Sequence, residues 1–265
     1  MAQRSRSLTS AKNPAVQRFR EAAAGRLEGL MIAEGVRLAW DAVRAGAEVV
    51  EAAVSPRLGD IDLRDALAER ADSFLDVSDA LLERLSALDT HQGVAAILRR
   101  PAWDDAALLG DELAPLVVAA AGLRDPGNVG AVIRTAEAAG ATGCLTLRGG
   151  ADPFRDKAVR GSMGSIFRLP VRHGLEVADA MAFARRQRLQ VVVADGGGGV
   201  PHTRVDLRRP TLLVIGAEAS GVESAWIETA DEHVRIPLQV PVESLNAAVA
   251  AGVLLFEAQR QRAAP

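Results

Sequence analysis

A short polar group, Glu243-Ser244-Leu245-Asn246, separates two apolar runs near the end of the chain, in IPLQVPVESLNAAVAAGVLLFE, residues 236–257. The first run is typical of a strand and the second of a buried, alanine-rich helix. A hydroxyl and a carboxamide at such a junction can cap the helix, and they can also hydrogen-bond to a ligand. For Ser244 the two roles are compatible, so this junction is a candidate site.

Glycine-rich or polar turns follow two other predicted strands. They are Ala194-Asp195-Gly196-Gly197, after VVV, and the stretch from Gly216 to Gly221, after LLVI. Glycines let a backbone approach a flat ligand closely and expose amide groups to it. We therefore expect a cofactor held mostly by main chain. The run GGGGV does not fit a dinucleotide-binding turn, because no helix begins there and Pro201 follows at once.

The stretch LRDPGNVGAVIRTAEAAGAT, residues 123–142, contains the next concentration of polar groups. Asn128 is a good N-cap, and the spacing predicts a helix over 128–140. Arg134 lies beside the apolar stripe of that helix among small residues, so another backbone can come close to it. Periodicity alone favours a surface ion pair between Arg134 and Glu137.

Predicted strands alternate with predicted helices both before and after the polar stretch 101–115. Residues 1–100 predict a small α/β domain with a basic N-terminal arm, and 101–115, with its prolines and acids, predicts a linker. Residues 116–265 predict a second α/β domain with a parallel sheet covered on both faces. Ligands in such sheets lie outside the carboxyl ends of the strands.

Composition narrows the class of protein. The chain of 265 residues is 49% hydrophobic, and its single cysteine, Cys144, excludes an internal disulfide and a cysteine-built zinc site. The four histidines are scattered, so we expect no metal. Because there is no signal-like N-terminus and no apolar stretch of about 18 residues, we expect a cytoplasmic protein without membrane spans.

Two basic stretches, residues 1–26 and 148–172, stand out on a chain whose net charge is only −3. They favour selective phosphate binding, with Arg18, Arg160 and Arg168 as candidate RNA contacts. Solvated charged faces, or a coding bias toward arginine, would produce the same pattern.

Three motifs resemble those of the SpoU/TrmH family, which are S-adenosylmethionine-dependent RNA ribose 2′-O-methyltransferases. They are NVGAVIRTAEAAGA, LLVIGAEASGV and RIPLQVPVESLNAAVAAG, and KAVRGSMGSIFRLPV between the first two is also similar to the family. The resemblance spans residues 116–260. The first domain is similar to the L30e-like RNA-binding module of the thiostrepton-resistance type of ribosomal RNA methyltransferase.

The resemblance implies a SPOUT fold with a C-terminal trefoil knot that holds S-adenosylmethionine, and a homodimer whose second subunit completes the active site. Knots are rare enough that periodicity could not indicate one. The residues expected to bind the cofactor are Ala194, Asp195, Gly196, Ile215, Gly216, Ala217, Gly221, Ile236, Pro237, Leu238, Ser244, Leu245 and Asn246.

The resemblance also implies a catalytic set, which maps onto Asn128, Arg134, Glu218, Ser244 and Asn246. The sulfonium already activates the methyl group, so the enzyme must align the ribose hydroxyl and help to remove its proton. A guanidinium stays protonated in proteins, so we interpret Arg134 as a fork that holds an RNA phosphate and orients the 2′-OH.

Three positions depart from the family pattern: Ala217, Gly161 and the turn Gln239-Val240-Pro241.

Aromatic residues make up only 3% and tyrosine is absent, which favours recognition of folded RNA over stacking of splayed bases. We therefore expect a 23S ribosomal RNA substrate. The alternatives are transfer RNA methylation and an RNA-binding protein that keeps the fold without turnover.

Overall fold

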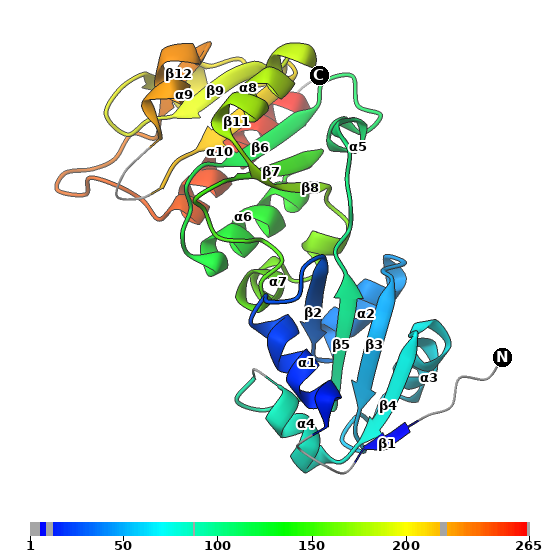
Figure 1. Ribbon diagram of the computed structural model, residues 1–265. Coiled ribbons are helices and arrows are strands. Elements are labelled where there is room, and N and C mark those ends of the chain that lie inside the picture. The colour runs from blue at the N-terminus through cyan, green and yellow to red at the C-terminus, as the bar shows by residue number, and fades with distance from the viewer. Residues whose placement is uncertain (1–5, 9–12, 87, 218–221, 264–265) are drawn as a thin grey trace. The chain divides into compact units, whose positions relative to one another are not determined.

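The computed structural model describes residues 6–8, 13–86, 88–217 and 222–263. Its contacts divide the chain into two compact units (Figure 1). The first comprises Met1–Pro101 together with Phe154–Arg168, and the second comprises Ala102–Pro153 together with Leu169–Pro265. The first unit thus recruits a segment from inside the predicted second domain.

The first unit is built on a five-stranded mixed sheet in the order β1-β4-β3-β5-β2. Strand β5 runs antiparallel to β2 and β3, while β1, β4 and β3 are parallel. The strands are β1 Arg6–Leu8, β2 Leu30–Glu34, β3 Val49–Val54, β4 Ser73–Val77 and β5 Val94–Arg99. The helices are α1 Pro14–Ala23, α2 Val36–Arg44, α3 Ile61–Arg70, α4 Asp79–Leu85, α7 Asp156–Ser162 and the 3-10 helix η1 Ser165–Phe167. The alternation of strands and helices predicted within residues 1–100 is found from β2 to β5.

Two helices of the first unit were not predicted. Helix α1 begins where the Asn13 side chain accepts a hydrogen bond from the Ala15 amide (2.9 Å), and it buries Phe19 completely in the core. Part of the predicted basic N-terminal arm is therefore an amphipathic helix. Helix α7 lies more than 50 residues beyond the rest of its unit in sequence and packs against β2.

The second unit is built on a seven-stranded sheet in the order β10-β12-β9-β11-β6-β7-β8. Every pairing in it is parallel, as predicted. The strands are β6 Leu116–Ala120, β7 Gly143–Leu147, β8 Val171–Leu175, β9 Gln190–Ala194, β10 Val200–Pro201, β11 Thr211–Ile215 and β12 Glu232–Arg235. The helices are α5 Asp105–Leu109, α6 Pro126–Ala138, α8 Val177–Arg186, α9 Ser224–Thr229 and α10 Ala247–Ala263, with the 3-10 helix η2 His202–Arg204.

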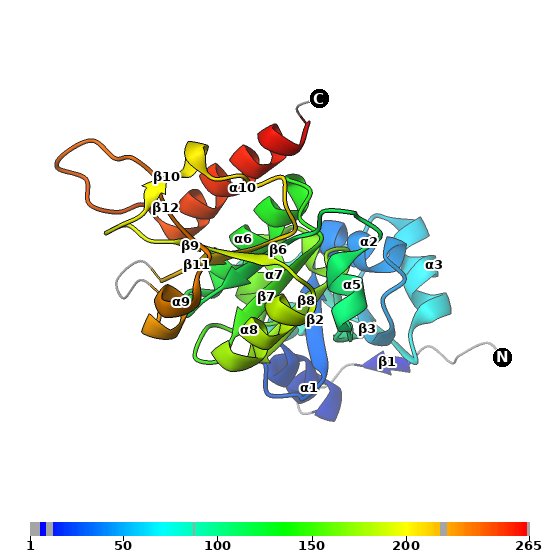
Figure 2. The ribbon, with the colours of Figure 1, turned by 90° about the horizontal axis from the view of Figure 1, so that it is seen from above.

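Helices cover both faces of this sheet, and Figure 2 shows α6 and α10 on one side with α8 and α9 on the other. Phe183 of α8 and Trp226 of α9 are buried in one apolar cluster against the strands. On the opposite face α10 packs along α6. The central strands β6, β7, β9 and β11 are buried on both faces, which is why they read as nearly continuous hydrophobic runs.

The stretch 101–115, predicted as a linker, contains α5, and all of it after Pro101 belongs to the second unit. Leu108 is fully buried in the core of that unit. A Cβ added to Gly143 would lie 2.6 Å from Leu108 Cδ2, so β7 fits against α5 only with glycine there. A five-residue helix among acids and prolines gives almost no periodic signal, and this explains the difference.

Candidate active site

A cavity of about 440 Å³ lies at the carboxyl ends of β9, β11 and β12. It is lined by Ala194, Asp195, Gly196, Gly197, Ile215, Gly216, Ala217, Val234, Arg235, Ile236, Leu238, Glu243, Ser244, Leu245, Ala247, Ala250 and Leu254. These come from the strand ends, from the segment before α10 and from α10 itself. The three segments that the sequence marked as polar or glycine-rich therefore meet around one cavity, at the edge where parallel sheets hold ligands.

Most of the residues expected to bind a cofactor line this cavity, but not all of them. Pro237 and Asn246 are not among the lining residues. Glu218 and Gly221 lie outside the described residues. For the others the position at the cavity is a finding, while the contact with a cofactor stays a prediction.

The turn after β9 is held by the side chain of Asp195. Its Oδ1 accepts a hydrogen bond from the Gly197 amide (3.0 Å), and a Cβ added to Gly198 would lie 3.1 Å from its Oδ2. The carboxylate therefore lies over the glycine run, which leaves it room. This turn positions a half-buried carboxylate in the wall of the cavity.

The end of the same glycine run is fixed to β12. Gly199 has a φ of +76°, and a Cβ there would lie 2.2 Å from the His233 carbonyl oxygen. The Arg235 guanidinium donates a hydrogen bond to the Gly199 carbonyl (2.8 Å). Glycine is required at this position because both the backbone conformation and the close approach exclude a side chain.

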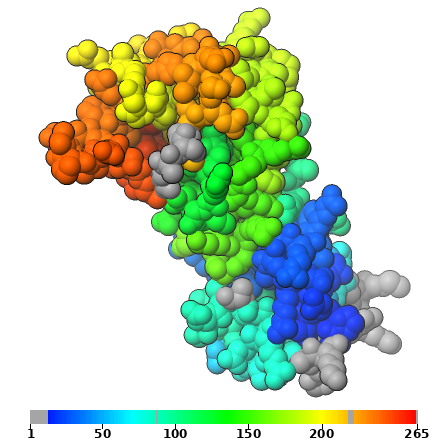
Figure 3. All heavy atoms as spheres, turned by 60° about the vertical axis from the view of Figure 1, so that its left-hand side comes forward, coloured from blue at the N-terminus to red at the C-terminus, as the bar shows by residue number. Residues whose placement is uncertain are grey.

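The segment 236–246 is neither strand nor helix, although the apolar run that begins at Ile236 was interpreted as typical of a strand. Strand β12 ends at Arg235, two residues before Pro237, which has no amide to donate to a ladder. The segment projects at the surface of the second unit (orange in Figures 1 and 3). Its turn is closed by a hydrogen bond from the Val242 amide to the Gln239 carbonyl (3.0 Å).

The cap of α10 is Asn246, not Ser244. The Asn246 side-chain oxygen accepts hydrogen bonds from the amides of Ala248 (3.0 Å) and Val249 (3.3 Å). Ser244 lies upstream of the helix, is exposed and lines the cavity. The hydroxyl is therefore available to a ligand, while the carboxamide orders the helix.

Asn128 is not the N-cap of its helix either. Helix α6 begins at Pro126, and the Asp125 carboxylate accepts a hydrogen bond from the Gly127 amide (2.6 Å). Proline suits the first helical position because its missing amide would have no partner there, so the helix begins two residues earlier than predicted. Asn128 is left to accept a hydrogen bond from the side-chain amide of Asn246 (3.1 Å). This bond joins two predicted catalytic residues that are 118 positions apart in sequence.

Arg134 is exposed on α6 and is not among the residues lining the cavity. On the same helix the Thr135 hydroxyl donates to the Ala131 carbonyl (2.7 Å), and Gly252 of α10 faces Thr135 at van der Waals distance. The close approach of another backbone, expected from the small residues of α6, is thus made by α10. The guanidinium itself remains accessible.

The three arginines predicted to contact RNA all belong to the first unit and all lie near carboxylates of that unit. Their shortest N···O separations are Arg18–Glu51 3.7 Å, Arg160–Asp156 2.6 Å and Arg168–Asp41 3.7 Å. Burial raises the pKa of Glu51 and of Asp156, with the nearby arginine acting in the opposite direction. An RNA role for these arginines stays a prediction, and part of their charge is neutralised within the unit.

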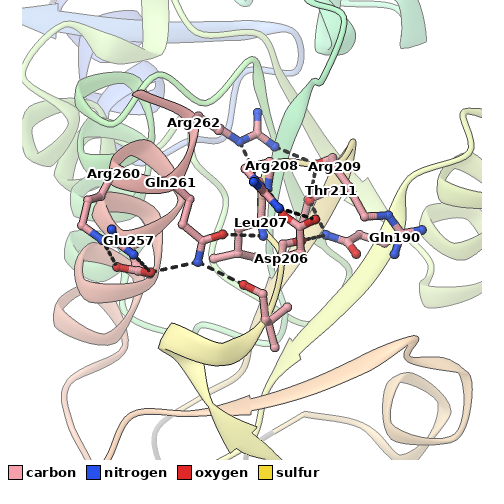
Figure 4. A network of polar contacts seen from close by, with 11 residues as sticks. Gln190, Asp206, Leu207, Arg208, Arg209, Thr211, Glu257, Arg260, Gln261 and Arg262 are labelled. Atoms are coloured by element: carbon pink, nitrogen blue, oxygen red, sulfur yellow. Dashed lines mark hydrogen bonds and ion pairs between the residues drawn. The ribbon is translucent and has the colours of Figure 1, made fainter. Parts of the chain in front are cut away.

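Helix α10, whose first turns line the cavity, is anchored at its other end by a polar network (Figure 4). Arg262 donates to the carbonyls of Leu207 (2.8 Å), Arg209 (2.9 Å) and Ala114. Gln261 accepts from the Leu207 amide (2.8 Å) and donates to the Val205 carbonyl (3.0 Å). These bonds fix the helix to the segment that leads into β11.

The network also contains an ion pair. Hydrogen bonds from Arg260 and Gln261 hold the pKa of Glu257 down at about 2, against the effect of burial. The carboxylate is therefore charged over the whole physiological pH range. It serves to order the last turns of α10.

Several lining residues were not predicted: Gly197, Val234, Arg235, Glu243, Ala247, Ala250 and Leu254. The alanines and Leu254 recur at helical spacing, so periodicity could have placed them on one face of the helix. Glu243 belongs to the polar group that first indicated the site. For Arg235 the sequence holds no local signal, because its role depends on pairing between β10 and β12.

Other chemistry has little support in the described parts of the chain. Burial raises the pKa of the Cys144 thiol to about 12, so it is neither a nucleophile nor a ligand. Across residues 6–8, 13–86, 88–217 and 222–263, no group of histidines, cysteines and acids is arranged to hold a metal ion. Within the same residues, no helix has the length and apolarity to cross a bilayer.

Comparison with known proteins decides the family. Residues 115–256, more than half of the chain, match the SpoU rRNA Methylase family, and residues 15–96 match the MRM3-like substrate binding domain. The chain belongs to the SpoU rRNA methylase family. The resemblance seen in the three sequence motifs is thereby confirmed, and the parallel sheet of the second unit is the catalytic fold of that family.

Individual relatives agree with the SpoU assignment. The chain is similar to the crystal structure of an AdoMet-bound rRNA methyltransferase from Sinorhizobium meliloti, with a TM-score of 0.87 and 29% identity over 96% of this chain and 97% of that one. It is also similar to the SpoU methyltransferase AviRb from Streptomyces viridochromogenes in complex with AdoMet, with a TM-score of 0.84 and 30% identity over 94% and 99% of the two chains.

A curated relative from Mycolicibacterium gilvum, described as an uncharacterized tRNA/rRNA methyltransferase, is 37% identical over 202 residues. The matched region covers 74% of this chain and 64% of the relative, so this match spans slightly less than two thirds of that protein. Both structural matches, by contrast, extend over the two units of the chain.

Proposed function

We propose that this protein transfers a methyl group from S-adenosylmethionine to a ribose 2′-hydroxyl in structured RNA, with 23S ribosomal RNA as the substrate. One observation supports this above the others. The segments of the three family motifs come together, since the second and third line one cavity and the first is joined to the third by the bond between Asn128 and Asn246. Solved relatives that hold AdoMet share this fold over nearly the whole chain.

The cavity fits the proposed cofactor in size and chemistry. Its volume of about 440 Å³ lies within the range of small-molecule sites, and its walls include Ile215, Leu238, Leu245 and Leu254. These side chains suit the apolar faces of adenine, while the backbone at Gly216 is open to hydrogen bonding. The cofactor supplies a methyl group on a sulfonium, which is an activated donor without a metal. The trefoil knot implied by the family resemblance is part of this proposal.

The residues of this chain then have to bind and orient the ribose. Ser244, at the cavity and exposed, is placed to hydrogen-bond to the incoming nucleotide. Asn128 and Asn246 hold each other, and so fix α6 against the start of α10. Arg134 grips an RNA phosphate with its planar fork and aligns the hydroxyl for in-line attack, which is a positioning role that a permanently charged group can fill.

Arg134 does not line the cavity of its own chain, and this favours a homodimer in which a second copy supplies it. Two apolar side chains on α10 support the same arrangement. Val249 is 53% exposed and Phe256 is 49% exposed, and their spacing of seven residues places them on one helix face. A second copy of this chain, rather than a different partner, is the proposed occupant of that face.

The dimer has a direct test. We expect Phe256→Glu to convert a dimer into a monomer in light-scattering measurements of mass, because a charge would be buried at the interface. Leu113, which is 99% exposed and lies outside α10, serves as a control, since Leu113→Glu should leave the mass unchanged. A wild-type protein that is monomeric at all concentrations would contradict the arrangement.

The first unit supports an RNA substrate, because residues 15–96 match a substrate binding domain. A domain of this kind, together with few aromatic platforms, favours folded ribosomal RNA. The decisive experiment is methylation of total RNA with labelled S-adenosylmethionine, followed by mapping of the modified position. Label in the ribose of 23S rRNA is expected. Label in transfer RNA would replace the substrate class, and RNA binding without label would identify a non-catalytic protein.

A further inference from the structure

The cofactor cavity carries an uneven set of charges. Among its described lining residues the ionisable groups are two carboxylates, Asp195 and Glu243, and one guanidinium, Arg235. We infer that these carboxylates make the cavity selective for a positively charged sulfonium over the neutral thioether that remains after methyl transfer. This inference rests on the proposed function and concerns release of the product.

Hydrogen bonds hold the side chains of Asp195 and Arg235 in place. Asp195 cannot turn away easily, because its Oδ1 is bonded to the Gly197 amide (3.0 Å) and its Oδ2 lies against Gly198. Arg235 is held by the neutral Gly199 carbonyl (2.8 Å), so this bond does not cancel its charge. Glu243 lies on the projecting segment before α10 and also lines the cavity. Three residues with charged side chains, on three separate segments, therefore line one cavity.

The charge of the ligand changes during the reaction. S-adenosylmethionine carries a sulfonium, an ammonium and a carboxylate, with a net charge of +1. In the transfer the ribose oxygen forms a bond to the methyl carbon, the carbon–sulfur bond breaks, and sulfur keeps the electron pair. The hydroxyl proton leaves to solvent. The product S-adenosylhomocysteine has no net charge and is otherwise the same molecule. Any difference between the affinities for the two ligands is therefore due to the sulfonium charge and its methyl group.

The size of the effect follows from Coulomb's law at the distances within such a cavity. A single carboxylate in a partly solvated wall should change the preference for the cation by about three- to tenfold. Arg235 acts in the opposite direction. The two carboxylates outnumber it, so the wild-type cavity should bind the sulfonium more tightly than the thioether.

The test is calorimetric titration of the full-length protein with S-adenosylmethionine and with S-adenosylhomocysteine, which measures binding without turnover. The ratio of the two dissociation constants is compared in wild type, Asp195→Asn, Glu243→Gln, the double variant and Arg235→Gln. Carboxamides keep the shape and much of the hydrogen bonding while they remove the charge. The matched control is Glu228→Gln, because Glu228 is an exposed acid of α9 that does not line the cavity.

We expect the preference for the sulfonium to fall about three- to tenfold in each carboxamide variant, to fall further in the double variant and to rise in Arg235→Gln. Glu228→Gln should match wild type. Raising the ionic strength should also reduce the wild-type preference, a readout that needs no variant. An unchanged ratio in the double variant, with both ligands still bound, would overturn the inference alone. A wild-type protein that binds neither ligand would overturn the proposed function and the inference with it.

Discussion

The two sheets of this protein differ in strand direction, and the difference bears on where a site can form. All strands of the second sheet are parallel, so the ends of β9, β11 and β12 lie at one edge and their turns surround a cavity. In the first sheet only β5 runs antiparallel to its neighbours, so the carboxyl end of β5 lies at the opposite end of the sheet from those of the other four strands. The first sheet therefore differs from the second by one central reversed strand.

The arginines with predicted functional roles differ in their surroundings. In the first unit the arginines predicted to contact RNA lie beside buried or half-buried carboxylates of the same unit, as Arg18 does beside Glu51. In the second unit Arg134 is exposed on α6, next to the helix that lines the cavity. An arginine that faces a carboxylate of its own unit should contribute less to function than Arg134. The experiments below test this contrast, beginning with the largest effect.

Replacing Arg134 should almost abolish catalysis. We expect Arg134→Ala to slow methyl transfer at least about 100-fold, because the hydroxyl loses its alignment, while the affinity for S-adenosylmethionine stays nearly unchanged. Labelled-methyl incorporation and calorimetry measure the two quantities. Arg134→Lys should recover little of the rate, since a point charge lacks the planar fork. Full activity of the alanine variant would remove Arg134 from the mechanism.

Replacing Gly199 should damage the cavity without touching a charged group. Gly199→Ala should weaken cofactor binding about tenfold, because the φ of +76° and the His233 carbonyl, 2.2 Å from a new Cβ, force the turn to move. Calorimetry measures the loss. Gly59→Ala is the matched control, since a Cβ there meets nothing within 4 Å. Equal affinity of the two variants would show that the turn after β9 does not shape the site.

Removing the carboxylate at Glu257 should change stability more than function. The native pKa of about 2 lies below the ordinary value of 4.5, so the ion pair with Arg260 stabilises the fold above about pH 4.5 and this contribution is lost as the pH falls toward 2. We expect Glu257→Gln to lower the free energy of unfolding by about 1 kcal/mol at pH 6, less than the pKa alone suggests because Arg260 is solvated.

Urea denaturation at pH 6 and pH 3 measures this loss, which should shrink at the lower pH. Glu228→Gln, at an exposed acid of α9, should show no such pH dependence. A loss that is equal at both values would mean that the carboxylate acts through packing alone.

The smallest effect is expected at Arg18. Because Arg18 already faces Glu51 at 3.7 Å, Arg18→Gln should weaken RNA binding less than about twofold and change the salt slope by much less than one. Arg26→Gln, at an exposed arginine of the same basic stretch, should weaken it more. Binding titrations over a range of salt concentrations compare the two. A larger loss of RNA affinity in Arg18→Gln than in Arg26→Gln would show that the carboxylate beside Arg18 does not reduce its contribution to RNA binding.

The sequence predicted the parallel sheet and its ligand-binding edge, because long apolar strands such as Leu116–Ala120 and Thr211–Ile215 and the glycines after them are strong local signals. Caps were less predictable. Both Asn128 and Ser244 are good capping residues, yet Asp125 and Asn246 are the caps, since competing candidates stood within three residues. The hydrogen bond between Asn128 and Asn246 spans 118 positions, and no local pattern contains it.

Local sequence patterns could not predict which unit each segment joins, because this also depends on contacts between residues far apart in the chain. Residues 154–168 belong to the first unit through tertiary packing. The seven residues of α7 contain no local pattern that indicates this. The stretch 101–115 was predicted as a linker because nothing local marks Leu108 as a core residue. Leu108 is buried by side chains from distant parts of the second unit.

Helix α7 packs on β2 although Pro101 and Phe154 are separated by most of the first half of the other unit. A protein truncated after Pro101 would therefore lack α7, and the side of β2 that this helix covers would be exposed to solvent. The boundary of the first unit is thus set by packing and not by an uninterrupted stretch of chain.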